Sequence, residues 1–292
     1  MIRPSAGLSP KARSIDNLLA SHRDLLRRYR LRPDKRLGQH FLVDAVALDR
    51  VVAAAGLQGT ETVLEVGAGL GALTTRLAQA SARVVAVEYD RRLLPPLREV
   101  LQGFENVDLL TEDVLQMDLA ALFGPQVYRV VANIPYQITA ALLRRFLEQG
   151  PAPDRLVLTV QKEVAERVTS GPGEMSLLAL GVQLYGVPSV VGRIAAESFL
   201  PPPDVDSAIL RVDVHPQPVV PPGMVATIFR LARAGFHQRR KKLRNALAAG
   251  LQLAPADVEQ RLTAAGVDPG ARAETLSLGD WRRLAEGWGA DL

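Results

Sequence analysis

One short stretch, Val63-Leu64-Glu65-Val66-Gly67-Ala68-Gly69-Leu70-Gly71-Ala72, joins an apolar run to a turn rich in glycine. The apolar residues before Gly67 are typical of a buried strand. The glycines let the backbone turn tightly, and they let a ligand approach with no Cβ in the way. The stretch therefore predicts a strand, a ligand-binding turn and the start of a helix.

Similar apolar runs alternate with helical stretches from residue 60 to residue 214. Runs that are apolar throughout suit strands covered on both faces, so the pattern predicts a doubly wound, Rossmann-like α/β sheet that is mostly parallel. The last two runs lie close together, which indicates an antiparallel strand at the edge. The predicted strands are Thr62–Val66, Arg83–Glu88, Val107–Leu110, Tyr128–Ala132, Leu156–Val160, Gln183–Val190 and Ser207–Val214.

The regions on either side of this pattern are predicted to be helical. Residues 14–30 place leucines near one stripe, and Ser14 is suited to cap that helix. Prolines between 216 and 222 mark a linker, and helices are expected beyond it at 223–249, 255–265 and 277–288. The predicted organisation is a basic helical extension at 1–34, an α/β domain at 35–214 and a small, all-α domain at 215–292.

The composition excludes several kinds of protein and site. The 292 residues include no cysteine, so disulfides, thiolate nucleophiles and zinc held by cysteine are ruled out. The histidines are scattered without the spacing of metal ligands, so no metal is expected. No apolar run approaches the roughly 20 residues that span a bilayer, and the N-terminus lacks an apolar secretory signal. We therefore expect a soluble, cytoplasmic protein with no membrane partner, and we expect separately that it is a monomer.

Positive charge is concentrated in two segments of the chain. Residues 1–36 contain ten Lys and Arg against three Asp, and residues 214–256 contain seven Lys and Arg with no acid, whereas the whole chain has a net charge of only +4. Clustered cations predict a polyanionic partner, because phosphate contacts come from such clusters. Solvated helix faces are the alternative explanation for each segment taken alone.

An acidic side chain follows the glycine turn at an informative spacing along the sequence. Glu88 ends the next predicted strand, 21 residues after Gly67, and is placed to accept hydrogen bonds from both hydroxyls of a ribose. Asp113, just past the third strand, is a candidate acceptor for an adenine amino group. These residues predict an adenosine-containing ligand at the carboxyl edge of the sheet. An NAD enzyme and an S-adenosylmethionine enzyme both fit the pattern.

The residues after the fourth strand, Asn133-Ile134-Pro135-Tyr136, point to chemistry on a nucleobase. An exocyclic amine on a purine is a poor nucleophile because its lone pair is delocalised. The Asn133 side-chain oxygen and a backbone carbonyl near Ile134 are suited to accept its two hydrogens and turn its lone pair toward an electrophile. Pro135 stiffens the turn, and Tyr136 offers a ring on which the base can stack.

Taken together, these motifs resemble the ribosomal RNA adenine N6,N6-dimethyltransferases, and specifically the bacterial small-subunit branch of that family. The resemblance extends from about Lys35 to the C-terminus. The matching segments, in order, are Lys35–Leu42, Gly67–Gly71, Glu88, Asp113, Asn133–Tyr136, Gln161–Arg167, Phe199–Ser207 and Phe236–Asn245.

The resemblance implies an enzyme that uses S-adenosyl-L-methionine to dimethylate N6 of two adjacent adenosines near the 3′ end of 16S rRNA, within the small ribosomal subunit or its precursor. It implies a target adenine held between Tyr136 and Phe199, with Asn133 orienting the amine. The residues that it assigns to the cofactor are His40, Leu42, Gly67, Gly69, Glu88, Asp113 and Asn133. His40 stands where the family usually has Asn.

The resemblance also implies that the basic run in the C-terminal domain contacts RNA. The residues concerned are Arg239, Arg240, Lys241, Lys242 and Arg244. Successive helical residues are about 100° apart, so these side chains cannot share one face of a helix. We expect one arginine near 239–240 to be held by an acidic residue and the others to face phosphate.

Three alternatives remain open from the sequence. An NAD(P)-dependent oxidoreductase would use the same glycine turn, but it leaves Asn133–Tyr136 unexplained. A non-enzymatic RNA-binding assembly or transcription factor would have kept the fold and lost activity. A sister enzyme that methylates large-subunit RNA would share most of the motifs, although Phe199–Pro203 and the basic run favour the small-subunit branch.

Overall fold

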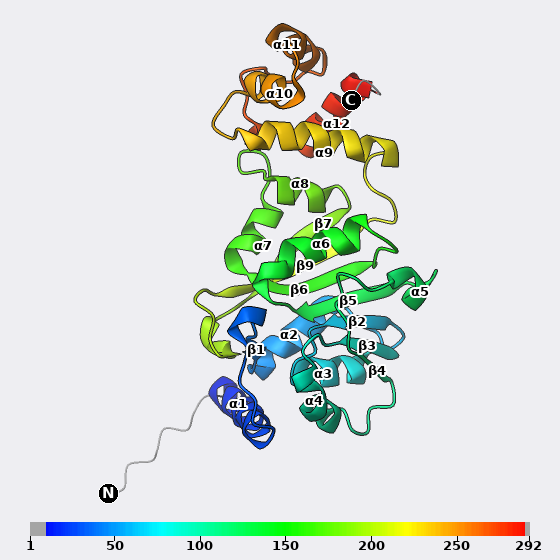
Figure 1. Ribbon diagram of the computed structural model, residues 1–292, viewed down its shortest axis with the longest axis vertical. Helices are drawn as coiled ribbons and strands as arrows, with labels where there is room; N and C mark the ends of the chain where they lie inside the picture. Colours follow the sequence, from blue (N-terminus) through cyan, green and yellow to red (C-terminus); the bar gives the residue numbers. More distant parts are fainter. Residues whose placement is uncertain (1–9, 290–292) are drawn as a thin grey trace, which may run out of the picture. The chain divides into compact units, whose positions relative to one another are not determined.

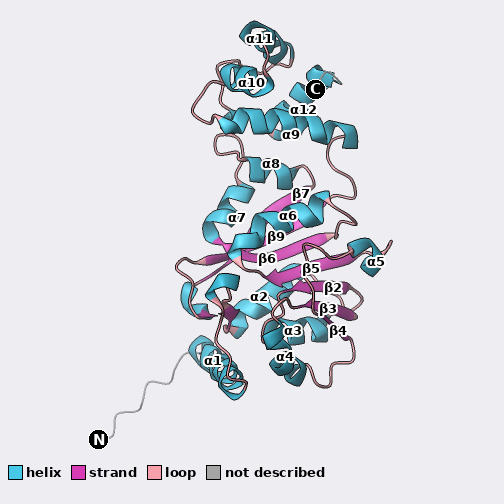
Figure 2. Cartoon of the chain, in the orientation of Figure 1, coloured by secondary structure: helices cyan, strands magenta, loops and turns pink. Residues whose placement is uncertain are grey.

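The computed structural model describes residues 10–289, and its contacts divide the chain into two compact units. The first unit contains the described residues up to Ala165 together with Ser189–Asp213. The second contains Glu166–Pro188 and the described residues from Val214 onward. Figures 1 and 2 show most of the strands gathered in one large sheet and the segment after residue 222 made of helices and loops.

The main sheet has seven strands in the order β4-β3-β2-β5-β6-β9-β7. Strands β2 to β6 run parallel, and β9 pairs antiparallel with β6. Every residue of the central strand β2 is buried, as expected for a strand covered on both faces. The strands are β2 Thr62–Val66, β3 Arg83–Val87, β4 Val107–Leu110, β5 Tyr128–Asn133, β6 Arg155–Gln161, β7 Gly186–Ile194 and β9 Ser207–Val214.

A second, two-stranded sheet lies outside the main one. It pairs β1, Phe41–Leu42, antiparallel with β8, Phe199–Leu200. The helices of the first unit are α1 Pro10–Arg28, α2 Ala45–Ala55, α3 Ala72–Ala80, α4 Leu94–Val100, α5 Leu119–Phe123 and α6 Thr139–Glu148, while α7 Lys162–Thr169 crosses the division between the units. The predicted fold class is confirmed, but helix α1 begins at Pro10, four residues before the expected cap at Ser14.

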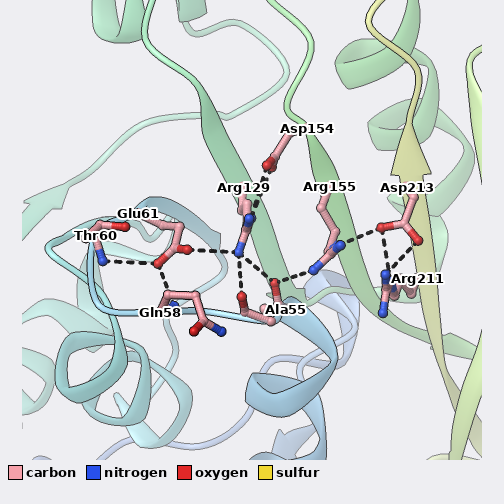
Figure 3. A network of polar contacts seen from close by, with 10 residues as sticks. Ala55, Gln58, Thr60, Glu61, Arg129, Asp154, Arg155, Arg211 and Asp213 are labelled. Atoms are coloured by element: carbon pink, nitrogen blue, oxygen red, sulfur yellow. Dashed lines mark hydrogen bonds and ion pairs between the residues drawn. The ribbon is translucent and has the colours of Figure 1, made fainter.

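Arginines at the amino ends of two paired strands hold the end of helix α2 (Figure 3). Arg129 and Arg155 are register partners in β5 and β6, and both donate to the carbonyl of Ala55, over 3.1 and 2.9 Å. Arg129 also donates to Gly56 O at 2.8 Å and to Glu61 at 3.2 Å. These bonds satisfy carbonyls at the C-terminus of α2 that have no partner within the helix. The guanidinium charges also interact favourably with the negative end of the helix dipole.

The second unit is a helical cluster built around two tryptophans. Its helices are α8 Leu177–Gln183, α9 Pro222–His237, α10 Leu243–Leu251, α11 Pro255–Ala264 and α12 Leu278–Trp288. Trp281 and Trp288 are 0% and 1% exposed, and they share a core with Ile228 and Leu231 of α9. The two tryptophans are thus core residues of this unit.

The single helix expected at 223–249 is wrong, because the chain leaves helical geometry in the basic run. Helix α9 ends at His237, and Lys242 has the extended ψ of 144° before α10 begins. Leu243 N donates to Ala271 O at 2.7 Å and Arg244 N to Pro269 O at 3.3 Å, so backbone donors that a continuous helix would use internally bond to a distant segment. The break instead places Arg239–Lys242 in a turn where all four are exposed.

Residues 166–188 belong to the second unit, whereas the sequence analysis assigns them to the first domain. The reason is apolar packing, since Ala179, Leu180 and Leu184 are fully buried in the same core as α9 and the tryptophans. Within residues 10–289, no helix is long and apolar enough to cross a membrane. The same residues contain no group of three acidic or histidine side chains arranged to hold a metal ion.

Replacing Arg129 with Met is expected to lower the free energy of unfolding by about 2–4 kcal/mol, because Glu61 and the α2 carbonyls lose their donor while remaining largely buried. Urea denaturation measures this change. Arg83→Met is the control, since its pair with Asp108 is exposed and contributes about 1 kcal/mol or less. Equal losses in the two variants would contradict the role given to Arg129.

Candidate functional site

The glycine turn that follows β2 has a backbone conformation that residues with a side chain rarely adopt. Gly67 and Gly69 have φ values of 76° and 59°, in the left-handed region. A Cβ on Gly69 would also lie 3.2 Å from the ring of Phe41. The turn therefore presents bare backbone at the carboxyl edge of the sheet, as the sequence predicts.

Glu88 lies beside this turn because β3 is parallel to β2 and in register with it. One carboxylate oxygen accepts from Gly69 N at 2.8 Å, and the other accepts from Asp90 N at 2.8 Å. Burial raises the pKa of Glu88, although both N–H groups oppose the rise. Each carboxylate oxygen keeps a lone pair, so two further donors, such as the hydroxyls of a ribose, can still bind.

Asn133 ends β5 at the same edge, and its side chain is held by backbone. Its Nδ2 donates to the carbonyl oxygen of His40 at 3.0 Å. That bond uses the nitrogen of the amide and leaves the side-chain oxygen available as an acceptor. The contact comes from the backbone of residue 40, so Asn133 is oriented whichever side chain stands there.

His40 also links the Asn133 loop to the segment after β8. Its Nδ1 donates to the carbonyl of Pro201 at 2.7 Å, so this nitrogen carries the proton and Nε2 is left facing other partners. Its ring stacks on that of Tyr136 at 6.0 Å between centroids and 16° between planes. The Tyr136 hydroxyl is in turn 2.6 Å from Ser207 Oγ, and burial raises the pKa of this tyrosine.

A cavity of about 290 Å³ brings most of the predicted site residues together. Those that line it are His40, Gly67, Gly69, Glu88, Asp113, Asn133, Ile134, Pro135 and Tyr136. Two predicted residues are not among its walls. Leu42 is 4% exposed and packs in the core of the α/β unit.

Phe199 is the second residue that does not line the cavity. It pairs with Leu42 between β8 and β1, is 3% exposed, and packs in the same core cluster as Leu42. Phe199 is therefore a buried residue that lines neither cavity beside Tyr136, and its role beside the target base stays a prediction. Pairing of β8 with β1 places this side chain in the core, and no pattern in the sequence predicts that pairing.

A second cavity, of about 320 Å³, shares His40, Tyr136 and Gln137 with the first. Its other walls come from Gln161, Pro203 and Asp204. Tyr136 and His40 therefore stand at the junction of two spaces, one beside Glu88 and the other beside the proline-rich segment.

Tyr89, at the site, and Glu65, which lines neither cavity, are two residues whose roles the sequence analysis does not predict. Tyr89 is 64% exposed and lines the first cavity, and its position directly after Glu88 was the available signal. Glu65 of β2 is 1% exposed, and burial, together with the charge of Glu88, raises its pKa to about 8. Its place inside an apolar run was the signal for a carboxyl that is neutral when folded.

The predicted RNA-contacting residues all lie in the second unit. Arg239, Arg240, Lys241 and Lys242 are exposed, and Arg239 is 3.8 Å from Glu274. Arg244 is held most closely by an acid, with its Nη1 2.6 Å from Glu259 Oε2. An arginine near 239–240 is therefore paired with an acid, as the sequence predicts, and Arg244 is paired with one more closely.

Known proteins match this arrangement along nearly the whole chain. The family model for ribosomal RNA adenine dimethylase matches residues 31–288. The chain belongs to the ribosomal RNA adenine dimethylase family. A relative from Dehalococcoides mccartyi (strain CBDB1), named ribosomal RNA small subunit methyltransferase A, is 44% identical over 93% of this chain and 94% of its own length.

Solved structures of similar fold support the same assignment. The 23S rRNA methyltransferase ErmE is 29% identical, with a TM-score of 0.69 over 85% of this chain and 98% of its own. A dimethyladenosine transferase from Plasmodium falciparum shares the fold, with a TM-score of 0.73 and 24% identity over 85% of this chain and 97% of its own. The predicted family and enzyme class are confirmed, which argues against the oxidoreductase and non-enzymatic alternatives.

The dimethylase family uses S-adenosylmethionine, and the first cavity fits this cofactor chemically. Acceptors for ribose hydroxyls are present on Glu88, an acidic side chain stands at Asp113, and the glycine turn leaves space that a Cβ would fill. We expect Glu88 to hold the ribose and Asp113 the adenine amino group of the cofactor.

Glu65→Gln tests the neutral buried carboxyl. The folded chain keeps Glu65 protonated to about pH 8, whereas the unfolded chain releases the proton near 4.5. Between these values the folded state binds more protons, so the unfolding free energy falls as pH rises. Gln removes this dependence, and the variant should gain on the order of 3–5 kcal/mol over the parent between pH 5 and pH 8 in urea denaturation.

Glu61→Gln serves as the control for that experiment. Burial opposes ionisation of Glu61, but the backbone N–H groups of Gln58 and Thr60 and the charge of Arg129 hold its pKa below the ordinary value. Its stabilising effect is lost only as pH falls below about 4.5. The difference in unfolding free energy between Glu61→Gln and the parent is therefore constant from pH 5 to pH 8. If the Glu65→Gln difference were equally constant, the carboxyl would already be ionised in the folded chain.

Proposed function

We propose that this chain transfers methyl groups from S-adenosylmethionine to N6 of two adjacent adenosines near the 3′ end of 16S rRNA, giving N6,N6-dimethyladenosines during assembly of the small ribosomal subunit. It acts as a cytoplasmic monomer on the subunit or its precursor. The observation that carries the proposal is the meeting of two cavities at Tyr136, with Glu88 and the glycine turn in one and Asn133 beside the junction.

Asn133 is proposed to orient the target amine. Its side-chain oxygen accepts one N6 hydrogen, since its nitrogen is already engaged by His40, and the carbonyl of Ile134 accepts the other. With both hydrogens held, the nitrogen becomes pyramidal and its lone pair points toward the cofactor cavity. When bound, S-adenosylmethionine supplies an electrophilic methyl group on its sulfonium.

The second cavity is proposed to hold the target adenine. Tyr136 is fixed by its hydroxyl contact with Ser207, and it offers a rigid ring on which a base gains roughly 1–3 kcal/mol by stacking. The ring of His40 lies against that of Tyr136, with 6.0 Å between centroids, and the two rings form part of the same wall of this cavity. No general base is required, because positioning alone lowers the barrier and the surplus proton leaves to water.

The small-subunit RNA is favoured over the large-subunit RNA by the name of the Dehalococcoides relative, which is 44% identical to this chain. ErmE, which acts on 23S rRNA, is less similar to this chain than the Dehalococcoides relative is. Labelled methyl transfer to unmethylated small and large subunits, followed by nucleoside analysis, separates the two. Dimethyladenosine in 16S rRNA alone is the expected product, and label only in 23S rRNA would overturn the assignment.

Asn133→Ala is expected to lower kcat for methyl transfer by on the order of 100- to 1,000-fold, because the acceptor that shapes the amine is lost. Affinity for S-adenosylmethionine, measured by calorimetry, should fall less than about tenfold. Asn106→Ala is the matched control, since this amide also donates to carbonyls but lies outside both cavities. Unchanged turnover in Asn133→Ala would remove it from the reaction.

Neutralising Arg240 and Lys242 with Gln should flatten the salt dependence of RNA binding. Each lost phosphate contact reduces the slope of log K against log salt by about 0.7–0.9, so two contacts reduce it by about 1.5. Arg282→Gln is the control, because this arginine is paired with Glu286 at 2.9 Å. An identical slope in parent and double variant would place the basic run away from phosphate.

A further inference from the structure

The helical unit contains a cavity of its own, of about 460 Å³. Its walls come from the end of α7, the start of α8 and the end of α9 together with the turn that follows. Four basic side chains line it, Arg167, Arg233, His237 and Arg239, and apolar walls include Leu177 and Phe236. Arg167 and Arg233, which are 66 positions apart in the sequence, thus line the same cavity. The basic run at 239–244 does not by itself predict this grouping.

The basic side chains of this cavity lack close acidic partners. Among residues 10–289, Arg167, Arg233 and His237 have no ion pair, and Arg239 has only Glu274 at 3.8 Å. Elsewhere in the chain, arginines such as Arg76, Arg83 and Arg155 are paired at 2.7–2.8 Å. No acidic residue lines the cavity, so positive potential is concentrated there without compensation and favours an anionic ligand.

The walls of the cavity are held in place without a ligand. The guanidinium of Arg233 lies 5.7 Å from the ring centre of Phe229. The loop before α8 is fixed to the segment 273–275, because Gly173 N and Met175 N both donate to Glu274 O, at 2.9 and 3.1 Å. A preorganised site loses less entropy on binding than a mobile one.

The lining is also partly apolar, which distinguishes it from a plain phosphate site. Phe236 is half-buried, with its ring centre 5.7 Å from that of Trp281, and Leu177 is half-buried beside it. An inorganic anion gains nothing from such a surface. A nucleotide has both a phosphate for the arginines and a flat base for the apolar wall.

We propose that this cavity binds one unpaired nucleotide of the rRNA substrate, at a point distinct from the adenosines that are methylated. Arg167 and Arg233 hold its phosphate, and Phe236 and Leu177 contact its base. The proposal rests on the proposed function, since it takes ribosomal RNA as the partner. It gives the helical unit a defined anchor in addition to the exposed basic run.

The test compares the full chain with the double variant Arg167→Gln, Arg233→Gln on unmethylated small subunits. Each lost contact to unpaired RNA weakens binding about fivefold at 0.1 M salt and lowers the salt slope by about 0.7. We expect KM for the subunit to rise about 25-fold, with kcat and affinity for S-adenosylmethionine unchanged. Arg230→Gln is the matched control, because Arg230 is an exposed residue of the same helix that does not line the cavity.

The outcomes separate this proposal from the proposed function. If the parent methylates small subunits and the double variant has the same KM and salt slope, the cavity does not bind RNA. If the parent fails to methylate any RNA, the proposed function itself fails. Arg167→Lys with Arg233→Lys should recover most of the affinity, which excludes misfolding as the cause of the loss.

Competition experiments test the chemical class of the ligand. A short single-stranded RNA should compete with the subunit against the parent, and should lose most of that effect against the double variant. Inorganic polyphosphate of equal charge should compete less well, because it has no base. Equal competition by polyphosphate would remove the base contact from the proposal, and stronger competition by polyglutamate would assign the cavity to an acidic protein.

Discussion

The register of three parallel strands is the constraint on which the site depends. Val66 pairs with Val87 on one side and with Ala132 on the other. The next residue in each strand or turn is therefore Gly67, Glu88 and Asn133. Parallel strands end at a common edge, so a backbone turn, a carboxylate and an amide meet there although their segments lie far apart in the sequence.

The same register sets the chemical character of the edge. It brings Glu88 against the N–H of Gly69, and the buried β2 residue Glu65 lies close enough for its pKa to be raised further by the charge of Glu88. Two carboxyl groups in one low-dielectric region do not ionise equally. The one that lacks backbone donors stays neutral to higher pH, and the one that accepts two N–H groups is left to receive a polar ligand.

His40 contributes to the site through both its backbone and its ring. Its backbone carbonyl accepts from the Asn133 side chain, and a carbonyl is present whichever residue stands at position 40. Its ring donates to the carbonyl of Pro201 and stacks on the ring of Tyr136. A different side chain at position 40 would therefore leave the Asn133 amide in place and would change the walls of the two cavities that His40 lines. The histidine ring adds a flat surface there, whereas the buried Phe199 does not.

Local patterns were sufficient for much of this protein. The apolar runs, the glycine turn, Glu88 and Asn133–Tyr136 predicted the sheet and its reactive edge, because strand periodicity and turn chemistry are properties of neighbouring residues. The burial of Phe199, the break after His237, the grouping of Arg167 with Arg233 and the packing of 166–188 with α9 were decided by tertiary structure. Each depends on contacts between distant segments, whose free energies no local pattern contains.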